Sequence, residues 1–342
     1  MSTSRGITLG KFLPLHKGHE LLLRAAAMHC DELTILVGTT PDDAFSFERR
    51  AKWIRSLLAR SPTTVRASID VVADPDPNPQ VEKDAAGTVV DESYWSQWLQ
   101  QNRMALANVD TVFTSDRYGA EVAKRIGARW FPVDPDREAV PIAASQIRAD
   151  TRSHFSAISD VAKPDVATTV AVVGAESTGK STLVKALAKH YGTSYAPEWG
   201  RIVSEAHAEL TKRDFDHIIS MQTELIRTAQ RTSNGLCFAD TEAITTALFA
   251  PIYLHDEHAA SWRCAKAQSF ALYLVLDPAV PWIDDGTRVL DTAQRDAFHQ
   301  ALVGALERLN KPYRLVGGDS YSSREEAARS AVDNLTSRFG PV

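Results

Sequence analysis

Short apolar runs alternate along the first half of the chain with longer segments whose apolar residues recur at helical spacing. The runs at 7–9, 33–37, 68–72, 109–114 and 128–132 read as strands, and the segments at 20–28, 47–58, 94–106 and 119–126 read as helices. Asp-Pro-Asp-Pro-Asn-Pro at 74–79 predicts a loop, because proline fixes φ and lacks an N–H donor. The alternation is typical of a parallel sheet with helices on both faces.

The same pattern starts again in the second half. Apolar runs at 169–173, 193–196, 236–239, 270–276 and 313–316 alternate with helix-like segments that include 180–190, 214–232 and 323–339. Lys163-Pro164-Asp165 interrupts the helical pattern before the first of these runs, so a domain boundary is expected within 157–168. We therefore predict an α/β protein with two doubly wound parallel-sheet domains, residues 1–162 and 168–342.

Composition narrows the class of protein. The chain has 342 residues, 44% of them hydrophobic and 24% charged, which is ordinary for a soluble globular protein. A formal net charge of −5 excludes a general basic footprint for nucleic acid. Cys30, Cys237 and Cys264 are far apart and suit a reducing compartment rather than disulfides or zinc. Since there is neither a long apolar run nor room for a signal peptide, we expect a cytoplasmic protein without a membrane partner.

The strongest chemical signal is Gly174–Thr182, which fits the P-loop pattern G-x-x-x-x-G-K-[ST]. The loop lies between a predicted strand and a predicted helix, where backbone N–H groups surround a phosphate. Lys180 is expected to reach the β- and γ-phosphates of ATP, and the Ser181 hydroxyl to bind Mg²⁺. The predicted phosphate-binding set is Gly174, Glu176, Ser177, Thr178, Gly179, Lys180, Ser181 and Thr182.

A second candidate site lies at the first strand-to-helix turn. His16, Gly18 and His19 form an H-x-G-H sequence there, and two imidazoles beside a helix N-terminus can donate hydrogen bonds to a polyphosphate. Two surface histidines near a helix cap are the alternative. Ser145 is expected to cap a later helix, with Arg148 in its first turn. An arginine there opposes the helix dipole, which favours a role in binding an anionic ligand rather than in the helix; a solvated surface arginine is the alternative.

Four segments in this order resemble the NadR-type bifunctional proteins: Gly10–His19, Val133–Arg137, Ser145–Arg148 and the P-loop. In that family a nicotinamide mononucleotide (NMN) adenylyltransferase domain precedes a ribosylnicotinamide kinase domain. The resemblance implies a Rossmann-like nucleotidyltransferase domain followed by a P-loop kinase domain. The sequence departs from the family pattern I-S-x-[ST]-x-I-R at Ala143, where the family has serine. We therefore expect a modestly reduced rate of adenylyl transfer.

The resemblance also implies roles in the first domain. His16 and His19 would stabilise charge at the α-phosphorus and on the leaving pyrophosphate, with Lys11 at the β- and γ-phosphates and Arg148 on the triphosphate. One tryptophan of the pair Trp95 and Trp98 would stack on the nicotinamide ring, the alternative being core packing. The implied ATP-binding residues also include Gly10, Phe12, Gly18, Ser115 and Ser145, and Arg49 is assigned to the nicotinamide nucleotide.

Three further motifs resemble the kinase half of the family. Glu198-Trp199-Gly200-Arg201 implies that Glu198 takes the proton of the substrate hydroxyl or holds the ribose, while Arg201 binds phosphate. Asp240-Thr241-Glu242 follows a predicted strand, so Asp240 is expected to bind Mg²⁺ through water, the alternative being a helix N-cap. Residues 282–288 imply a mobile lid. Arg288 would reach the transferred phosphate, and Glu242, Asp284 and Asp285 would contact the nucleoside.

These observations predict a bifunctional enzyme of NAD biosynthesis and salvage. ATP would phosphorylate nicotinamide riboside to NMN, and a second ATP would adenylylate NMN to give NAD and pyrophosphate, both with Mg²⁺. A bifunctional enzyme of coenzyme A synthesis, with a phosphopantetheine adenylyltransferase and a kinase, is the first alternative. A nucleotide-sensing regulator with a degenerate first site is the second.

Some family members carry an N-terminal helix-turn-helix. Only Met1–Arg5 precede the first predicted strand, so we expect that module to be lacking and no nucleic-acid partner. The sequence leaves a monomer and a homo-oligomer equally open.

Overall fold

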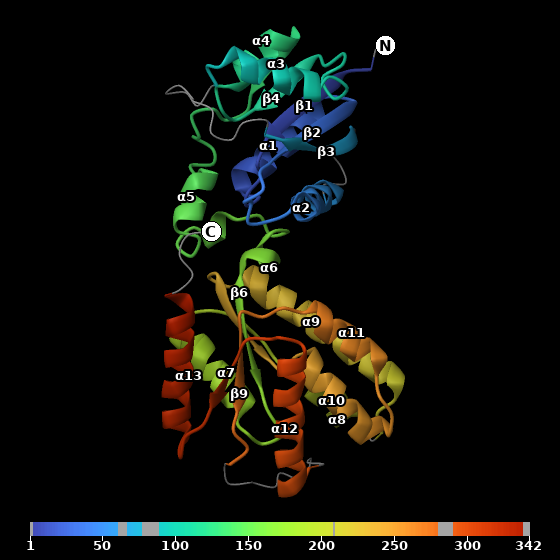
Figure 1. Ribbon diagram of the computed structural model, residues 1–342, viewed down its shortest axis with the longest axis vertical. Helices are drawn as coiled ribbons and strands as arrows, with labels where there is room; N and C mark the ends of the chain where they lie inside the picture. The colour runs from blue at the N-terminus through green and yellow to red at the C-terminus, as the bar shows by residue number, and fades with distance from the viewer. Residues whose placement is uncertain (1–2, 61–66, 77–88, 208, 280–289, 338–342) are drawn as a thin grey trace. The chain divides into compact units, whose positions relative to one another are not determined.

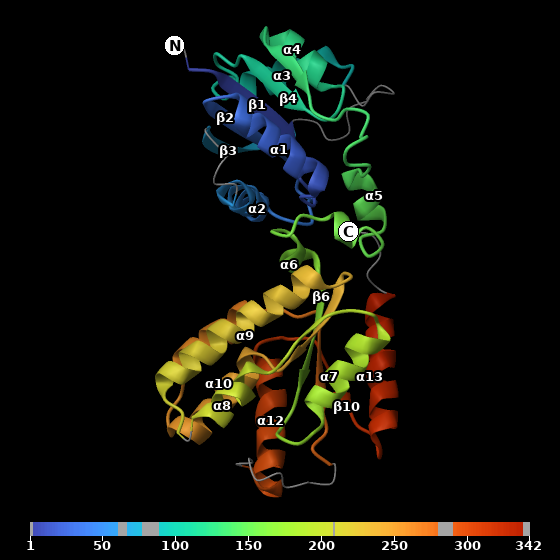
Figure 2. The same ribbon diagram turned by 180° about the vertical axis from the view of Figure 1, so that it is seen from behind.

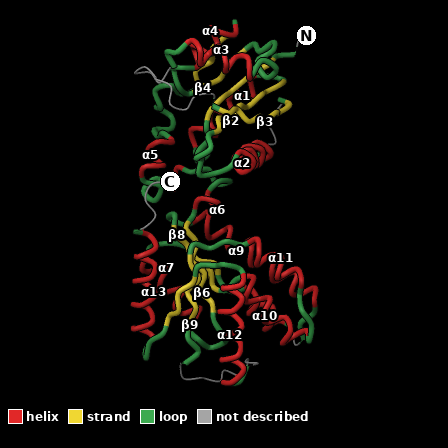
Figure 3. Tube along the Cα trace, viewed as in Figure 1, coloured by secondary structure: helices red, strands yellow, loops and turns green. Residues whose placement is uncertain are grey.

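The structure is a computed structural model that describes residues 3–60, 67–76, 89–207, 209–279 and 290–337. The chain divides into two compact units, Met1–Ala162 and Lys163–Gly340. Each unit is built on a five-stranded sheet with helices on its faces, as Figure 1 and the reverse view in Figure 2 show. Figure 3 separates the strands from the helices. The predicted α/β class with two parallel sheets is confirmed.

The first unit contains the strands β1 to β5 and the helices α1 to α5. The strands are β1 (Arg5–Gly10), β2 (Glu32–Thr39), β3 (Ser68–Pro75), β4 (Thr111–Thr114) and β5 (Arg129–Pro132); the helices are α1 (Lys17–His29), α2 (Phe47–Ala59), α3 (Glu92–Gln101), α4 (Gly119–Ile126) and α5 (Ala144–Ala149). All pairs are parallel, in the order β3-β2-β1-β4-β5. The order reverses between β1 and β4, and ligands of open α/β sheets bind where the carboxyl ends of two such strands diverge.

Helices cover both faces of the first sheet. On one face, Ile7, Leu36 and Val112 from three neighbouring strands pack in a buried cluster with the indoles of Trp95 and Trp98 on α3 and with apolar residues of α4. On the other, α1 and α2 contact each other and the strands β1, β2 and β3. Since a strand points successive side chains to opposite faces, both cores follow from the apolar runs in the sequence.

The second unit has the sheet order β10-β9-β6-β8-β7, with parallel pairs throughout. Its elements are α6 (Lys163–Val166), β6 (Thr168–Val173), α7 (Lys180–His190), β7 (Tyr195–Ala196), α8 (Trp199–Ala206), α9 (Lys212–Thr232), β8 (Leu236–Asp240), α10 (Ala243–Leu254), α11 (Ala259–Ala267), β9 (Leu272–Leu276), α12 (Thr292–Arg308), β10 (Tyr313–Val316) and α13 (Tyr321–Thr336). Within the described ranges, no helix is both long enough and apolar enough to cross a membrane.

Residues of β6 alternate between two separate cores. Val170 and Val172 pack with α7 and α13 on one face. Ala171 and Val173 pack with α9, α10, α11 and α12 on the other face. This two-sided burial explains why β6 reads as a continuous apolar run, and it fixes the strand that leads into the P-loop.

Several element boundaries differ from the sequence-based prediction, among them the following three. β3 continues to Pro75, inside the predicted loop, because β3 is an edge strand and an edge tolerates a missing N–H donor. α3 ends at Gln101 instead of Leu106. Pro164 does not end a helix but occupies the first turn of α6, where a helix leaves its N–H groups unpaired in any case.

Candidate active sites

The P-loop connects β6 to α7 through two glycines in backbone conformations that side chains disfavour. Gly174 has φ 153° and Gly179 has φ 86°. A Cβ atom at Gly174 would lie 3.2 Å from the Leu276 carbonyl oxygen, and one at Gly179 would lie 2.8 Å from the Tyr321 ring. Ser177, at the crest, also has a positive φ of 62°. The backbone path of the loop therefore requires glycine at positions 174 and 179.

Polar groups inside the loop are arranged for a ligand. Lys180 is 6% exposed, and its Nζ donates to the Ala175 carbonyl at 2.9 Å. The Ser177 hydroxyl is buried and has no hydrogen-bond partner within the described ranges. A buried hydroxyl without a partner is rare in native structures, and a phosphate oxygen in the loop would supply one.

Asp240, the predicted magnesium ligand, lies at the carboxyl end of β8, and its surroundings show whether a Mg²⁺ ion would fit there. It is 3% exposed, and its Oδ1 atom has no hydrogen-bond partner among the residues that the structure describes. Burial and the nearby Glu198 carboxylate raise the pKa of Asp240, whereas Lys180 and a hydrogen bond from Ser181 oppose that rise. A buried carboxylate oxygen without a partner, beside the Ser181 hydroxyl, fits the oxygen ligands that Mg²⁺ prefers.

The remaining ligands of such an ion would be water and phosphate. Among the residues the structure describes, no group of three His, Cys, Asp or Glu could hold a metal ion by itself. Mg²⁺ in phosphoryl-transfer sites is typically held by one or two protein groups plus waters and substrate phosphates. Asp240 and Ser181 therefore suffice as the protein's share.

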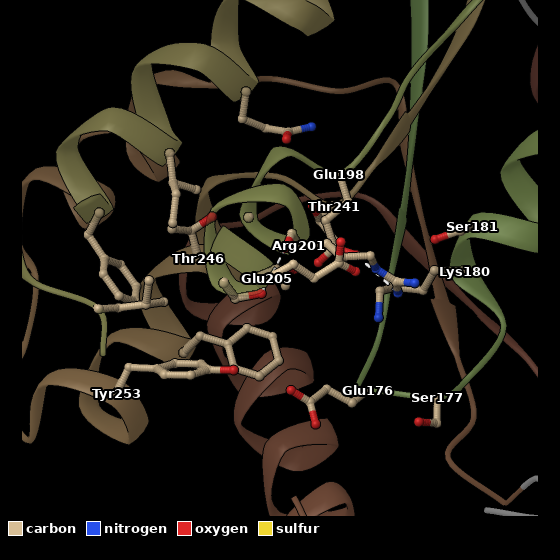
Figure 4. A pocket seen from close by; sticks show the side chains of 18 of the residues that line it. Glu176, Ser177, Lys180, Ser181, Glu198, Arg201, Glu205, Thr241, Thr246 and Tyr253 are labelled. Atoms are coloured by element: carbon tan, nitrogen blue, oxygen red, sulfur yellow. Dashed lines mark hydrogen bonds and ion pairs between the residues drawn. The ribbon is translucent and has the colours of Figure 1, made fainter. Parts of the chain in front are cut away.

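A cavity of about 790 Å³ opens beside the P-loop. Figure 4 shows Lys180 and Ser181 on one side of this cavity and Tyr253 on the opposite side. An ion pair joins Glu198 Oε2 to Arg201 Nη2 at 3.5 Å. The predicted site residues that line the cavity are Glu176, Ser177, Gly179, Lys180, Ser181, Thr182, Glu198 and Arg201. Lining residues that the sequence did not single out include Glu205, Phe215, Thr246, Phe249 and Tyr253.

Glu242 does not take the predicted role. It is fully buried and caps α10: its Oε2 accepts from the Ile244 N–H at 2.6 Å and its Oε1 from the Thr245 N–H at 3.0 Å. The nucleoside-binding assignment of Glu242 is therefore corrected to a helix cap. The N-cap alternative for Asp240 falls with it, because Glu242 already fills that position. Asp284, Asp285 and Arg288 lie outside the described residues.

Three buried polar residues that the sequence reading missed hold the site loops in place. Gln222 accepts from the Trp199 N–H at 2.8 Å and donates to the Asp240 carbonyl at 3.2 Å. Arg324 on α13 donates to the Thr178 carbonyl of the P-loop at 3.3 Å. In the first unit, Arg50 donates to the Lys11 carbonyl at 2.7 Å. Each of these three residues is a polar side chain on the buried, otherwise apolar face of its helix. That interruption of the apolar pattern is the sequence signal by which they could have been found.

In the first unit, the two histidines lie at the start of α1, as the sequence suggested. His16 is the N-cap, and its Nδ1 accepts a hydrogen bond from the Gly18 N–H at 3.1 Å. The neutral ring must then carry its proton on Nε2, which is the tautomer that can donate to a ligand. The ring centroids of His16 and His19 are 3.7 Å apart, and those of Phe12 and His19 are 4.9 Å apart.

Both histidines are neutral at neutral pH. Burial, with the charges of Arg137 and Arg148 nearby, lowers the pKa of His16 to about 4. Burial and the neighbouring His16 ring lower the pKa of His19 well below its usual value. Two neutral imidazoles thus lie within the electrostatic reach of two arginines. The His19 ring also has a hydrogen bond to the Pro14 backbone, and its Nδ1 atom has no partner among the described residues. A polyphosphate there would raise both pKa values, because an anion favours the charged imidazolium.

Arg148 lies beside the histidines, but not for the predicted reason. α5 spans only Ala144–Ala149, so Arg148 sits in its last turn, where a cation is favourable for the helix dipole. Its Nη1 donates to the Leu13 carbonyl at 2.7 Å. Ser145 is not the N-cap either. Ala143 holds that position, and only the Gln146 side chain closes the cap, accepting from the Ala143 N–H at 2.8 Å.

Ala143→Ser is expected to stabilise the first unit by about 1 kcal/mol, because a serine hydroxyl would accept a backbone N–H of α5 and complete the capping box. Thermal unfolding followed in the full chain measures this. Ala144→Ser is the matched control, since it adds the same hydroxyl one residue inside the helix. Equal stability of the two variants would contradict the cap assignment.

The other predicted residues of the first unit divide between surface and core. Lys11 and Arg49 are exposed, and Lys11 Nζ lies 3.9 Å from Asp43 Oδ1. Trp95 and Trp98 are 5% and 3% exposed, and both Nε1 atoms donate to protein groups. Both indoles thus pack in the core, and stacking on a nicotinamide ring stays a prediction. Gly10 ends β1, and Ser115 directly follows β4.

Fold and site define a P-loop nucleotide-binding protein that carries a second, Rossmann-like unit with a histidine pair. The chain is 30% identical, over 93% of its length, to the trifunctional NAD biosynthesis/regulator protein NadR of Escherichia coli (strain K12), and covers 80% of that protein. It is 29% identical, over the same shares, to the protein of that name from Salmonella typhimurium. The chain therefore belongs to the NadR family.

Two further comparisons concern the fold. A family model described as an AAA domain matches residues 169–324, which include the P-loop. A crystal structure of NadR protein in complex with NR has the same fold, with a TM-score of 0.70 at 24% identity, and the match covers 100% of this chain and 98% of that one. A structure of NadR protein in complex with NAD and AMP-PNP matches with a TM-score of 0.68 at 24% identity over 99% and 97% of the chains.

Proposed function

We propose that the chain catalyses two consecutive steps of NAD formation. The unit Lys163–Gly340 would phosphorylate nicotinamide riboside, and the unit Met1–Ala162 would transfer AMP from a second ATP to the product. The observation that carries the proposal is the Asp240 carboxylate oxygen, which has no hydrogen-bond partner in the described part of the chain and lies near Ser181, a residue that lines the cavity of about 790 Å³. The choice of substrates rests on the relatives, which are named as NAD biosynthesis proteins.

In the kinase reaction, the riboside hydroxyl oxygen attacks the γ-phosphorus of ATP, and ADP leaves. Mg²⁺, held by Ser181 and through water by Asp240, would neutralise charge between the β- and γ-phosphates. The Lys180 ammonium lies in the loop that would hold those phosphates. Glu198 and Arg201 line the same cavity, where Glu198 would accept the hydroxyl proton and Arg201 would bind the phosphate. Catalysis then rests on position and charge.

The lining of the cavity suits a cationic ring. Tyr253, Phe215 and Phe249 line the cavity together with the carboxylates Glu176 and Glu205. Burial and the nearby carboxylates of Glu176 and Glu198 raise the pKa of Tyr253 to about 12, so negative charge surrounds this ring. Aromatic faces with carboxylates attract a cation, and the nicotinamide ring of the riboside carries a positive charge.

In the adenylyl transfer, a phosphate oxygen of NMN attacks the α-phosphorus of ATP, and pyrophosphate leaves. The two neutral imidazoles donate N–H groups to the phosphates, while Arg148 and Lys11 supply positive charge. No covalent intermediate on the protein is required, because both reacting groups are held together in one site.

Separate assays of the two half-reactions with the purified protein test the proposal. We expect formation of NMN and ADP from nicotinamide riboside and ATP, and formation of NAD and pyrophosphate from NMN and ATP. Replacing NMN by pantetheine phosphate should give no product. Turnover of pantetheine phosphate, or sequence-specific DNA binding without either reaction, would overturn the proposal in favour of coenzyme A synthesis or a regulator.

A further inference from the structure

The segment that follows β5 has an unusual backbone close to the histidine turn. Asp134 and Arg137 both have positive φ, 52° and 56°. The Asp134 carboxylate accepts the N–H groups of Ala139 at 3.1 Å and Val140 at 3.0 Å, which closes the loop on itself. Val140 lies against the start of α1, 3.9 Å from the Cβ position of Gly18. Two non-glycine residues in this conformation within four positions indicate a backbone held for function.

Two reciprocal ion pairs join this loop to the end of β4. Arg137 Nη2 lies 2.8 Å from Asp116 Oδ1, and Arg117 Nη2 lies 2.7 Å from Asp136 Oδ1. All four side chains are at least 40% exposed, so neither pair contributes much to stability and either can exchange partners.

The two arginines differ in what they face. The charge of Arg137 acts on both His16 and His19 and, together with Arg148, depresses the pKa of each ring, whereas Arg117 is not among the causes. Arg137 is therefore the arginine of the two pairs whose charge reaches both rings. Its ion pair with Asp116 holds it at the carboxyl end of β4, the strand next to β1 at the point where the strand order reverses.

We propose that Arg137 is a further triphosphate ligand of the first unit, which exchanges the Asp116 carboxylate for phosphate oxygens when ATP binds. The inference rests on the proposed adenylyl transfer. A guanidinium binds two oxygens of a phosphate in the same forked geometry as a carboxylate, so the exchange conserves the hydrogen bonds of Arg137. Arg148 would hold the same triphosphate from the other side, and Arg137 would balance charge that builds on the leaving pyrophosphate.

Arg137→Gln and Arg117→Gln in the full chain are the matched test, since each removes one of the two ion pairs. The probe is inorganic pyrophosphate, followed through the ring proton resonances of His16 assigned with His16→Gln. Arg137→Gln should weaken pyrophosphate binding at His16 and raise the KM for ATP in NAD synthesis, each by about tenfold. It should also raise the pKa of His16 in the free protein. Arg117→Gln should change none of these, and Arg137→Lys should restore part of the affinity.

Equal effects of Arg137→Gln and Arg117→Gln, or no effect of either, would overturn the inference, because both pairs would then only brace the loop. Riboside phosphorylation in the second unit checks that each variant is folded. If the wild-type protein made no NAD from NMN, the proposed function would fail. The pyrophosphate shift of His16 and its dependence on Arg137 would still decide the inference.

Discussion

Lys180→Ala is expected to lower kcat/KM for phosphorylation of nicotinamide riboside by about 10²–10³-fold and to leave NAD synthesis from NMN unchanged. Lys180 is buried in the P-loop with its ammonium on the Ala175 carbonyl, so it is already in place for the phosphates of ATP. Neither Ser181 nor Asp240 can supply the lost positive charge. The histidine pair belongs to the other unit and shares no described hydrogen bond with the P-loop.

Lys185→Ala is the control for this variant, because Lys185 lies on the same helix with its side chain exposed. Initial rates of both half-reactions, together with a thermal unfolding curve, separate loss of chemistry from loss of fold. Normal riboside phosphorylation by Lys180→Ala would show that the P-loop is not the kinase site. Loss of both reactions in a folded protein would show that the two active sites are not independent.

The fold was predictable because strands and helices here have strong local signals. β6 is a two-sided apolar run, and the P-loop follows it with glycines at the positions where positive φ is required. The histidine turn was predictable for the same reason, since His16 and His19 lie next to each other on one helix start. The strand, the P-loop and the histidine turn each depend on residues that are close in the sequence, so the sequence pattern predicts them.

What the sequence could not give were contacts between distant segments. Gln222 joins α9 to β8, and Arg324 joins α13 to the P-loop, over 18 and 146 positions of the chain. Glu242 was misassigned because a carboxylate that follows a strand gives the same sequence pattern whether it binds a ligand or caps the next helix. Only its burial and its two backbone partners distinguish these roles.

His19→Ala is expected to have the opposite effect to Lys180→Ala: NAD synthesis from NMN falls by about 10²–10³-fold and riboside phosphorylation stays unchanged. The His19 ring, in the first turn of α1, contacts the rings of His16 and Phe12, with ring centroids 3.7 Å and 4.9 Å apart, so its loss removes a polar group and loosens the orientation of His16. Because burial holds the pKa of His19 well below its usual value, the ring is neutral at neutral pH in the free enzyme, where it also has a hydrogen bond to the Pro14 backbone.

His19→Asn distinguishes hydrogen bonding from charge, because its amide is a neutral donor of similar reach. We expect it to retain more NAD synthesis than His19→Ala. We also expect the wild-type kcat/KM to show no loss on this account as the pH rises through 6.5, since burial holds the pKa of His19 well below that usual value. His29→Ala, at the exposed end of the same helix, is the control for helix stability. If His19→Asn were as inactive as His19→Ala, and activity fell as the pH rose through 6.5, the ring would act as a cation. The neutral-donor mechanism would then be wrong.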